Sequence, residues 1–264
     1  MELPNLLDED PLGFWPRLAT ARHPLLGLDY DGTLAPFQVD RMAAVPFEGV
    51  VEALRALVDS GSTRVVIISG RLAAEVVELL GEVGVTTVGS HGYEVRHPDG
   101  RLERTPLEPA QTRALGHSEE LVGQLGLAER LERKAASLAF HTRGLDLQQA
   151  RSLELEVWRR WSPAAQQSGM LCTHFDGGVE LRARGIDKGS VLAALLEQES
   201  ADLAVHIGDD QTDEDAFAML RQRGGVGIKV GPGETAASAR LPGCRQVLQF
   251  LRRWHRTLWA TQQS

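Results

Sequence analysis

The stretch GLDYDGTLAP, residues 27–36, contains the clearest structural signal in this chain. It completes a short run of apolar residues that begins at residue 24 and predicts a buried strand. Two carboxylates, Asp29 and Asp31, stand one residue apart at the end of this strand, and a glycine and a threonine follow at once. Buried charges are costly unless they are paired. The stretch therefore indicates a strand that delivers two carboxylates to a chemical site.

The rest of the chain alternates between apolar β-branched runs and segments of helical periodicity. A strand, a helix, a strand and a helix are expected in turn over 24–30, 48–59, 63–69 and 71–80. The alternation resumes with a strand, VELR, after residue 178, followed by helix, strand, helix, strand and helix over 188–199, 203–209, 213–222, 225–230 and 245–260. Such alternation is typical of parallel sheets. We therefore predict an α/β fold with a doubly wound parallel sheet.

The segment 106–177 has a different pattern of apolar and polar residues. Its expected elements are a helix near 109–127, the alternating stretch RKAASLAFHTR at 133–143, a helix at 145–161 and a strand near 169–175. Two helices with two long alternating strands predict a small, open-faced α+β layer. We expect residues 106–177 to form a cap domain inserted into a core made of 1–105 and 178–264.

Charge and hydropathy exclude several classes of function. The chain has 36 acidic and 28 basic residues and a formal charge of -8, so a general attraction to nucleic acid or anionic lipid is not expected. The acidic start MELPNLLDED is unlike a signal peptide, and no apolar run approaches the ~20 residues that span a bilayer. Two cysteines offer neither a disulfide framework nor a zinc spacing. We expect a cytoplasmic protein with a small-molecule substrate and no nucleic-acid or membrane partner.

Charged and hydroxyl side chains follow several of the predicted strands. Open parallel sheets bind ligands outside the carboxyl ends of their strands. The residues expected at this edge are Asp29, Asp31, Thr33, Ser69, Arg71, Asp209, Asp210, Asp213 and, at the start of a helix, Lys188. Five carboxylates on one edge repel one another unless a cation is bound, and hard oxygen ligands favour magnesium. We therefore predict a Mg²⁺ site that also binds phosphate.

The spacing of Asp29 and Asp31 suits phosphoryl transfer. A carboxylate that attacks a phosphate dianion faces a repulsion of ~8 kcal/mol at about 4 Å and an effective dielectric of about 20. Magnesium and Lys188 would offset this repulsion. If Asp29 is the attacking carboxylate, Asp31 follows it by two residues. Asp31 can then protonate the departing ester oxygen and later deprotonate the hydrolytic water.

Four motifs resemble those of the haloacid dehalogenase (HAD) superfamily of phosphatases. They are DYDGT at 29–33, Ser69 in IISGR, Lys188 in GIDKG and GDDQTDED at 208–215. Within that superfamily the chain resembles the trehalose-6-phosphate phosphatase family, through LDYDGTLAPF, GSHGYE at 89–94, ERKAASLAFHTR at 132–143 and GDDQTDEDAF. The resemblance covers nearly the whole chain and implies a Rossmann-like core with a specificity cap.

The resemblance also implies a role for each site residue. Asp29 would be the nucleophile and Asp31 the acid and base. Magnesium would be held by Asp29, the backbone carbonyl of Asp31 and Asp209, with Asp213 in support. Phosphate would be bound by Ser69 and Lys188. The disaccharide would be held by Glu132, Lys134 and Arg143 in the cap, and by Glu180.

Two core residues keep a functional and a structural alternative. Arg71 follows Ser69 closely and contacts either phosphate or an acidic neighbour. His91 in SHGYE either faces the site or has a structural role.

The sugar-binding assignment has a physical counterpart in the alternating stretch of the cap. If that stretch is one strand, Glu132 and Lys134 point to one side together, and so do His141 and Arg143. Such groups can hydrogen-bond the hydroxyls of a sugar. The alternative is a solvated outer face of the cap sheet.

These observations predict a magnesium-dependent phosphatase that converts trehalose 6-phosphate into trehalose and phosphate through an aspartyl-phosphate intermediate. One alternative is a phosphatase of another phosphorylated glycoside, such as sucrose 6-phosphate or mannosylglycerate phosphate. Others are a phosphotransferase and a non-catalytic sugar-phosphate sensor. The presence of Asp29, Asp31, Lys188 and Asp209 argues against the sensor. The family resemblance also raises a functional link to a trehalose-6-phosphate synthase.

Overall fold

The computed structural model describes residues 3–175 and 177–262, and the chain divides into two compact units. The first unit comprises Met1–Glu103 and Asp187–Ser264, and the second comprises Arg104–Ile186. The first unit is therefore built from two segments of the chain, with the second unit inserted between them.

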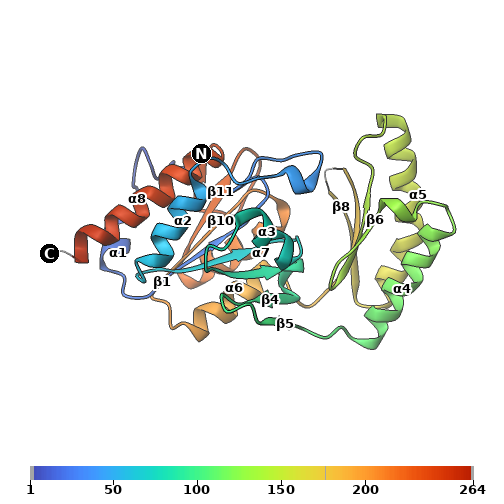
Figure 1. Cartoon of the computed structure of the whole chain (residues 1–264), viewed down its shortest axis with the longest axis horizontal. Helices are drawn as coiled ribbons and strands as arrows, with labels where there is room; N and C mark the ends of the chain where they lie inside the picture. The colour runs from blue at the N-terminus through green and yellow to red at the C-terminus, as the bar shows by residue number, and fades with distance from the viewer. Residues whose placement is uncertain (1–2, 176, 263–264) are drawn as a thin grey trace. The chain divides into compact units, whose positions relative to one another are not determined.

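An eight-stranded sheet forms the centre of the first unit (Figure 1). Its order is β12-β11-β10-β1-β2-β3-β4-β5, with β1 in the middle of the sheet. The strands are β1 (Pro24–Leu28), β2 (Arg64–Ile68), β3 (Thr86–Gly89), β4 (Glu94–Arg96), β5 (Leu102–Arg104), β10 (Leu203–Gly208), β11 (Val226–Val230) and β12 (Ala239–Leu241). All pairs from β12 to β3 are parallel, and β4 runs antiparallel to β3.

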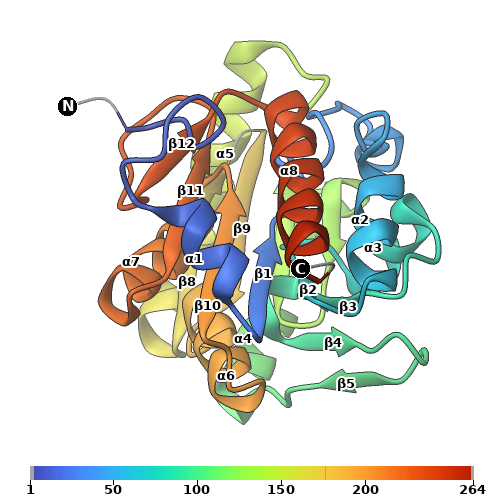
Figure 2. The same cartoon turned by 90° about the vertical axis from the view of Figure 1, so that its left-hand side faces the viewer.

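Helices cover both faces of this sheet (Figure 2). The helices that pack on one face are α1 (Phe14–Thr20), α2 (Val50–Asp59), α3 (Ala73–Leu80) and α8 (Cys244–Gln262), and those on the other are α6 (Lys188–Gln198) and α7 (Glu214–Arg223). Successive strand residues point to opposite faces: Leu26 and Leu28 of β1 join the first core and Leu25 the second. The predicted doubly wound α/β fold is confirmed.

The second unit is a four-stranded antiparallel sheet with two helices. The strands follow the order β6 (Leu131–Arg133), β7 (Ser137–His141), β9 (Gly178–Ala183) and β8 (Met170–Phe175), and the helices are α4 (Pro109–Gly123) and α5 (Leu147–Gln167). Trp161 of α5 is fully buried and donates its indole N–H to the Ser118 carbonyl of α4. This hydrogen bond joins the two helices.

The strand after residue 178 is a correction to the sequence prediction. It was assigned to the parallel sheet of the core, but β9 pairs with β7 and β8 in the second unit. The reason lies in its pattern, since apolar Val179 and Leu181 alternate with charged Glu180 and Arg182. Such alternation is typical of an antiparallel strand with one apolar face, whereas buried parallel strands are continuously apolar.

The alternating stretch of the cap is also not one strand. Strands β6 and β7 form a hairpin whose turn is closed by a hydrogen bond from the Lys134 N–H to the Ser137 carbonyl. Lys134 therefore lies in the turn, not on a strand with Glu132. A single-strand assignment failed because periodicity alone does not show where a chain reverses.

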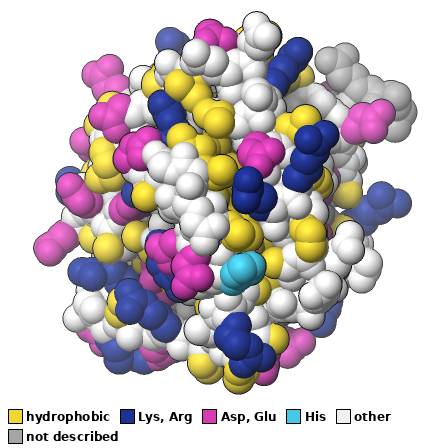
Figure 3. Space-filling view, turned by 90° about the vertical axis from the view of Figure 1, so that its right-hand side faces the viewer, with side chains coloured by type: hydrophobic (Ala, Val, Ile, Leu, Met, Phe, Trp, Pro, Cys, Tyr) yellow, Lys and Arg dark blue, Asp and Glu magenta, His cyan; other side chains and the backbone are white. Residues whose placement is uncertain are grey.

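Acidic and basic side chains are interspersed with apolar ones on the face shown in Figure 3. Within the part of the chain that the structure describes, every helix is too short or too polar to cross a membrane.

Candidate active site

The carboxyl ends of the central strands place the predicted core residues at one edge of the sheet. Asp29 follows β1, and its N–H donates to the carbonyl of Ile207 in β10, which continues the ladder by one residue. Asp209 follows β10, and Ser69 follows β2. Parallel strands end on the same side, so these side chains meet at the carboxyl edge.

Lys188 connects two carboxylates in the interior. Its Nζ lies 2.7 Å from Oδ1 of Asp29 and 2.8 Å from Oδ1 of Asp213. All three side chains are buried. Lys188 is the first residue of α6, and the carboxylate of Asp187 caps that helix by accepting from the Ser190 N–H. The cap therefore sets where the lysine leaves the helix.

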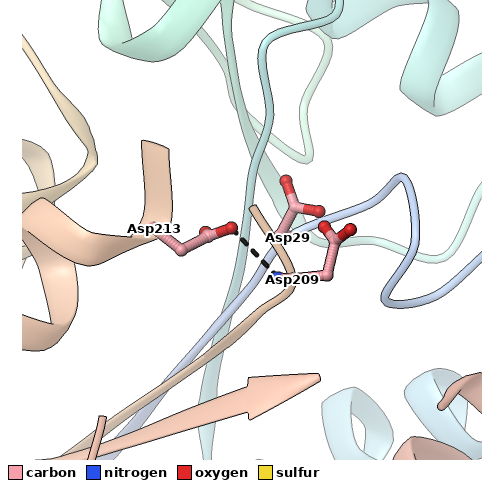
Figure 4. Close-up of side chains that lie close together, drawn as sticks. All are labelled: Asp29, Asp209 and Asp213. Carbon is pink, nitrogen blue, oxygen red and sulfur yellow. Dashed lines mark hydrogen bonds between the residues drawn. The ribbon is translucent and has the colours of Figure 1, made fainter. Parts of the chain in front are cut away.

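Asp213 organises the loop that follows β10. Its Oδ2 accepts the backbone N–H groups of Asp209 and Asp210, both at 3.1 Å, and Figure 4 shows the bond to Asp209. Its Oδ1 also lies 2.7 Å from Nε2 of His206. The Asp213 carboxylate therefore holds this loop in place and also contributes a negative charge to the site.

The carboxylates respond differently to this environment. Burial raises the pKa of Asp29 well above its usual value despite Lys188, and Asp213 and Asp209 add to the rise. Burial and repulsion from Asp210 and Asp213 raise the pKa of Asp209 to about 7. Although burial opposes ionisation of Asp213 too, Lys188 and the hydrogen bond from His206 hold its pKa well below the usual range. Asp213 thus keeps its charge, and Asp29 and Asp209 favour a further cation.

The donor set fits a magnesium ion. Asp29, Asp209 and Asp213 each offer a carboxylate oxygen, and these oxygens lie within 4.8 Å of one another (Figure 4). Hard oxygen donors of this kind are the ligands that Mg²⁺ prefers. The side chain of Asp31, the fourth residue predicted for the metal, lies outside this group, in keeping with a role for its backbone carbonyl alone.

Asp31 is instead held by Arg71. Nε and Nη2 of Arg71 each lie 2.6 Å from a different carboxylate oxygen of Asp31. The backbone N–H of Arg71 donates to Oγ of Ser69, so the turn after β2 positions the guanidinium. Of the two sequence alternatives for Arg71, the contact that the structure contains is the one with an acidic neighbour.

His91 packs against the same turn. Its N–H donates to the Ser69 carbonyl, and its backbone has a φ of 57°, in the left-handed region. A Cβ added to Gly70 would lie 2.6 Å from the imidazole, so the ring depends on a glycine there. Ser69, Gly70 and His91 therefore form one packed unit at the carboxyl edge of the sheet.

The sugar-binding residues predicted for the cap lie in the second unit. Glu132 and Glu180 are both in register with Ala139 of β7, one from each side, so they share one face of the sheet. Glu132 lies 2.8 Å from Nε2 of His141, and Glu180 accepts from Ser137 and from Lys134. This face thus presents a row of charged and polar groups.

Arg143 lies just beyond this row, after β7. A Cβ added to Gly177 would lie 2.8 Å from its Nε, so the residue at 177 must be small for the arginine to hold its place.

Two buried residues near the carboxylates were missed from the sequence. Lys229 of β11 donates from Nζ to the Asp209 carbonyl, and its positive charge limits the rise in the pKa of Asp209. His206 of β10 contacts Asp213. The signal for Lys229 was a charge inside the apolar strand VGIKV. His206 gave no comparable signal, because a single histidine in an apolar run carries little information.

Comparison with known proteins identifies the family. The family model described as trehalose-phosphatase matches residues 27–242, which include most of both segments of the first unit and all of the second. This chain belongs to the trehalose-phosphatase family.

Curated members of the trehalose-phosphatase family differ in length from this chain. The trehalose-6-phosphate phosphatase of Escherichia coli is 30% identical, with 84% of this chain and 83% of that protein covered. A bifunctional trehalose-6-phosphate synthase/phosphatase of Thermoproteus tenax is 34% identical over 89% of this chain but 32% of that protein. The chain thus spans about a third of the length of the archaeal relative.

Solved structures support the HAD fold of this family member. The C-terminal domain of the trehalose-6-phosphate phosphatase of C. albicans superposes with a TM-score of 0.82 at 22% identity, covering 96% of this chain and 98% of that one. A Bacteroides thetaiotaomicron phosphatase of the haloalkanoate (HAD) superfamily has a TM-score of 0.62 at 19% identity, covering 88% and 94%. Both likenesses concern the α/β fold.

Proposed function

We propose that this chain is a magnesium-dependent phosphomonoesterase that hydrolyses trehalose 6-phosphate to trehalose and phosphate. The observation that supports this most is the placement of Lys188, whose ammonium group lies between Asp29 and Asp213 in a buried site. A buried cation that touches the nucleophile can donate a hydrogen bond to a phosphate oxygen and offset its charge. Membership of the trehalose-phosphatase family supports the substrate.

In the first step, a carboxylate oxygen of Asp29 attacks phosphorus and the bond from phosphorus to the ester oxygen breaks. Lys188 offsets the charge that gathers between the carboxylate and the phosphate. Asp31 gives its proton to the departing sugar oxygen, so that free trehalose leaves. Asp29 then carries the phosphoryl group as an acyl phosphate.

In the second step, Asp31 takes a proton from water, and the water oxygen attacks phosphorus. The bond from Asp29 to phosphorus breaks, and inorganic phosphate leaves with the carboxylate restored. Because Arg71 holds both oxygens of Asp31, one oxygen must turn toward the ester oxygen while the guanidinium keeps the other in place.

Magnesium held by Asp29, Asp209 and Asp213, with the carbonyl of Asp31, would supply positive charge that reduces repulsion between Asp29 and the phosphate dianion. The raised pKa values of Asp29 and Asp209 support this set, because the rise comes from burial and from neighbouring carboxylates, and a further cation would offset both. Ser69, which accepts from the Arg71 N–H at the edge of the sheet, would bind the phosphate together with Lys188.

Recognition of the disaccharide is assigned to the polar face of the cap sheet. Glu132 and Glu180 would accept hydrogen bonds from sugar hydroxyl groups, whereas Lys134 and Arg143 would donate hydrogen bonds to the sugar oxygens. In the core, Arg71 and His91 would face the substrate from the turn after β2. The cap, as domain 104–186, would thereby set the choice of sugar.

The cellular setting also belongs to this proposal. We place the enzyme in the cytoplasm, in keeping with the described helices, each too short or too polar to cross a membrane. The archaeal relative carries a synthase and a phosphatase in its name. We include a functional link between this chain and a trehalose-6-phosphate synthase, because the product of such a synthase is the proposed substrate.

The deciding experiment measures phosphate release from trehalose 6-phosphate, sucrose 6-phosphate and glucose 6-phosphate, with Mg²⁺ and then with chelator. We expect a strong preference for trehalose 6-phosphate that disappears with chelator and in Asp29→Asn. Equal rates across the panel would overturn the substrate but keep the chemistry. Binding of a sugar phosphate without release would favour the sensor instead.

A further inference from the structure

His206 lies in the interior of the first unit, in the middle of β10. Its side chain is fully buried, and the strand residues on either side of it, Val205 and Ile207, belong to the apolar core. On its own face of the sheet, the imidazole meets the ring of Phe217 from α7, with centroids 5.8 Å apart. A polar ring at such a position requires a partner to offset its burial.

The partner is the carboxylate that also holds Lys188. Nε2 of His206 lies 2.7 Å from Oδ1 of Asp213, and the same oxygen accepts Nζ of Lys188 at 2.8 Å. Lys188 in turn reaches Oδ1 of Asp29 at 2.7 Å. A continuous buried chain of contacts therefore runs from His206 to the proposed nucleophile.

The other ring nitrogen shows which tautomer the site accommodates. Nδ1 of His206 has no hydrogen-bond partner among the residues that the structure describes. A proton on Nδ1 would leave a buried donor unpaired, whereas a proton on Nε2 points at a carboxylate oxygen. The geometry thus assigns the proton to Nε2.

The neighbouring strand makes room for this ring. Gly27 of β1 is in register with His206, and a Cβ at Gly27 would lie only 2.9 Å from Nδ1. Glycine inside a strand costs conformational entropy and leaves no side chain to pack. Its presence between Leu26 and Leu28 is explained by the space that the imidazole occupies.

We propose that His206 is a positioning residue for phosphoryl transfer. Its Nε2–H orients the Asp213 carboxylate so that Oδ1 keeps Lys188 against Asp29. The inference rests on the proposed function, because Lys188 and Asp29 carry the reaction only if the chain is a phosphatase. It adds a residue that touches neither substrate nor Asp29 and that acts through Asp213, one of the proposed metal ligands.

The test compares two substitutions at this position. His206→Phe keeps a ring of similar size and removes the donor, whereas His206→Gln keeps a side-chain N–H near the place of Nε2. Loss of a partner that orients an active-site ligand typically costs 10–100-fold. We expect kcat to fall about tenfold or more in His206→Phe, with KM unchanged, and to return to within about threefold of the wild type in His206→Gln.

The losses should be equal for trehalose 6-phosphate and for a small aryl phosphate, because the contact is remote from the sugar. Phe250→Leu is the matched control: Phe250 is equally buried but belongs to the core on the other face of the sheet. It should lower the melting temperature and leave kcat within about twofold.

A readout independent of activity uses NMR of protein labelled with ¹⁵N-histidine. In the wild type, without substrate, the resonance that disappears in His206→Phe should show a protonated Nε2 and an unprotonated Nδ1. A proton on Nδ1, or equal losses of kcat in His206→Phe and His206→Gln, would overturn the proposal. If the wild type releases no phosphate from any substrate, the proposed function fails while the tautomer assignment is tested separately.

Discussion

Arg71 holds Asp31 through two hydrogen bonds, each 2.6 Å long, from Nε and Nη2 to the two carboxylate oxygens. The guanidinium is buried and also lies over the ring of Tyr30, 5.3 Å from its centroid. Although burial opposes the charge, the bonds to Asp31 raise the pKa of Arg71. The proposed acid and base is therefore fixed in orientation by a cation from the neighbouring strand end.

A change of Arg71 to lysine tests this relationship. Lysine keeps the charge but loses the planar fork that meets both oxygens. A hydrogen bond to a charged group contributes about 1.5–3 kcal/mol, so we expect kcat for phosphate release to fall about 10- to 100-fold in Arg71→Lys. Arg64→Lys is the control, because Arg64 pairs with Glu199 at the start of β2 and not after its end. Equal kcat values for the two variants would contradict the positioning of Asp31 by Arg71.

Gly32 offers a second test, because a side chain there would overlap the carboxylate of Asp209. Its φ of 73° also lies in the left-handed region, which costs other residues about 1 kcal/mol or more. We expect Gly32→Ala to reduce phosphate release at least tenfold at saturating Mg²⁺, since Asp209 must move.

The matched control for that substitution is Gly231→Ala. Gly231 has nearly the same φ, 74°, but an added Cβ would meet open space. Gly231→Ala should therefore lower only the free energy of unfolding, by about 1 kcal/mol, which chemical denaturation measures. Activity lost to the same extent in both variants would show that backbone strain, not displacement of Asp209, is responsible.

Glu132 tests the role of the cap face. We expect Glu132→Ala to raise KM for trehalose 6-phosphate tenfold or more, equivalent to about 1.4 kcal/mol, because a sugar contact is lost. KM for a small aryl phosphate should change by less than about twofold. Glu119→Ala is the control, since Glu119 pairs with Arg133 at an exposed position. Comparable KM changes for both substrates would remove Glu132 from sugar recognition.

The hydrogen bonds of the Asp202 carboxylate predict that the free energy of unfolding depends on pH. This carboxylate accepts the N–H groups of Arg22 and His23 just before β1, at 2.7 and 2.9 Å. Although burial opposes ionisation, these bonds lower the pKa of Asp202 below its usual value of 3.8. A depressed pKa means that the stabilisation is present above about pH 4 and is lost as the pH falls through the folded-state value.

Because Asp202 is exposed and solvent screens its hydrogen bonds, we expect Asp202→Ala to lower the free energy of unfolding at pH 7 by about 1 kcal/mol. The difference from the wild type should shrink as the pH falls below about 4. Denaturation with urea at pH 7, 5 and 3.5 measures it. Asp99→Ala, in an exposed turn, is the control and should stay within about 0.5 kcal/mol of the wild type. A difference that grows toward low pH would refute the sign.

Much of the core site could be predicted because its residues follow strands. Asp29, Ser69 and Asp209 each stand directly after an apolar run, and parallel strands bring their carboxyl ends to one edge. Lys188 was found through its motif and its place at the start of a helix. Local patterns of a few residues were sufficient for these assignments.

The cap was predicted less well. Its insertion and its two helices followed from composition and periodicity, but β9 was assigned to the wrong sheet and the hairpin of β6 and β7 was read as one strand. Strand partners are contacts between distant residues, so a short alternating run is compatible with several of them. The alternation of Val179 to Arg182 contained the correct signal for an antiparallel strand.

The doubly wound core, the order of its motifs and the edge at which the carboxylates gather could therefore be predicted, because these depend on periodicity and on where strands end. Two contacts could not be predicted: Arg71 binds both oxygens of Asp31 from 40 residues away, and His206 meets Asp213 in the space left by Gly27. Those contacts depend on which strands lie side by side and on how closely they pack. Neither property can be predicted from a short stretch of the sequence.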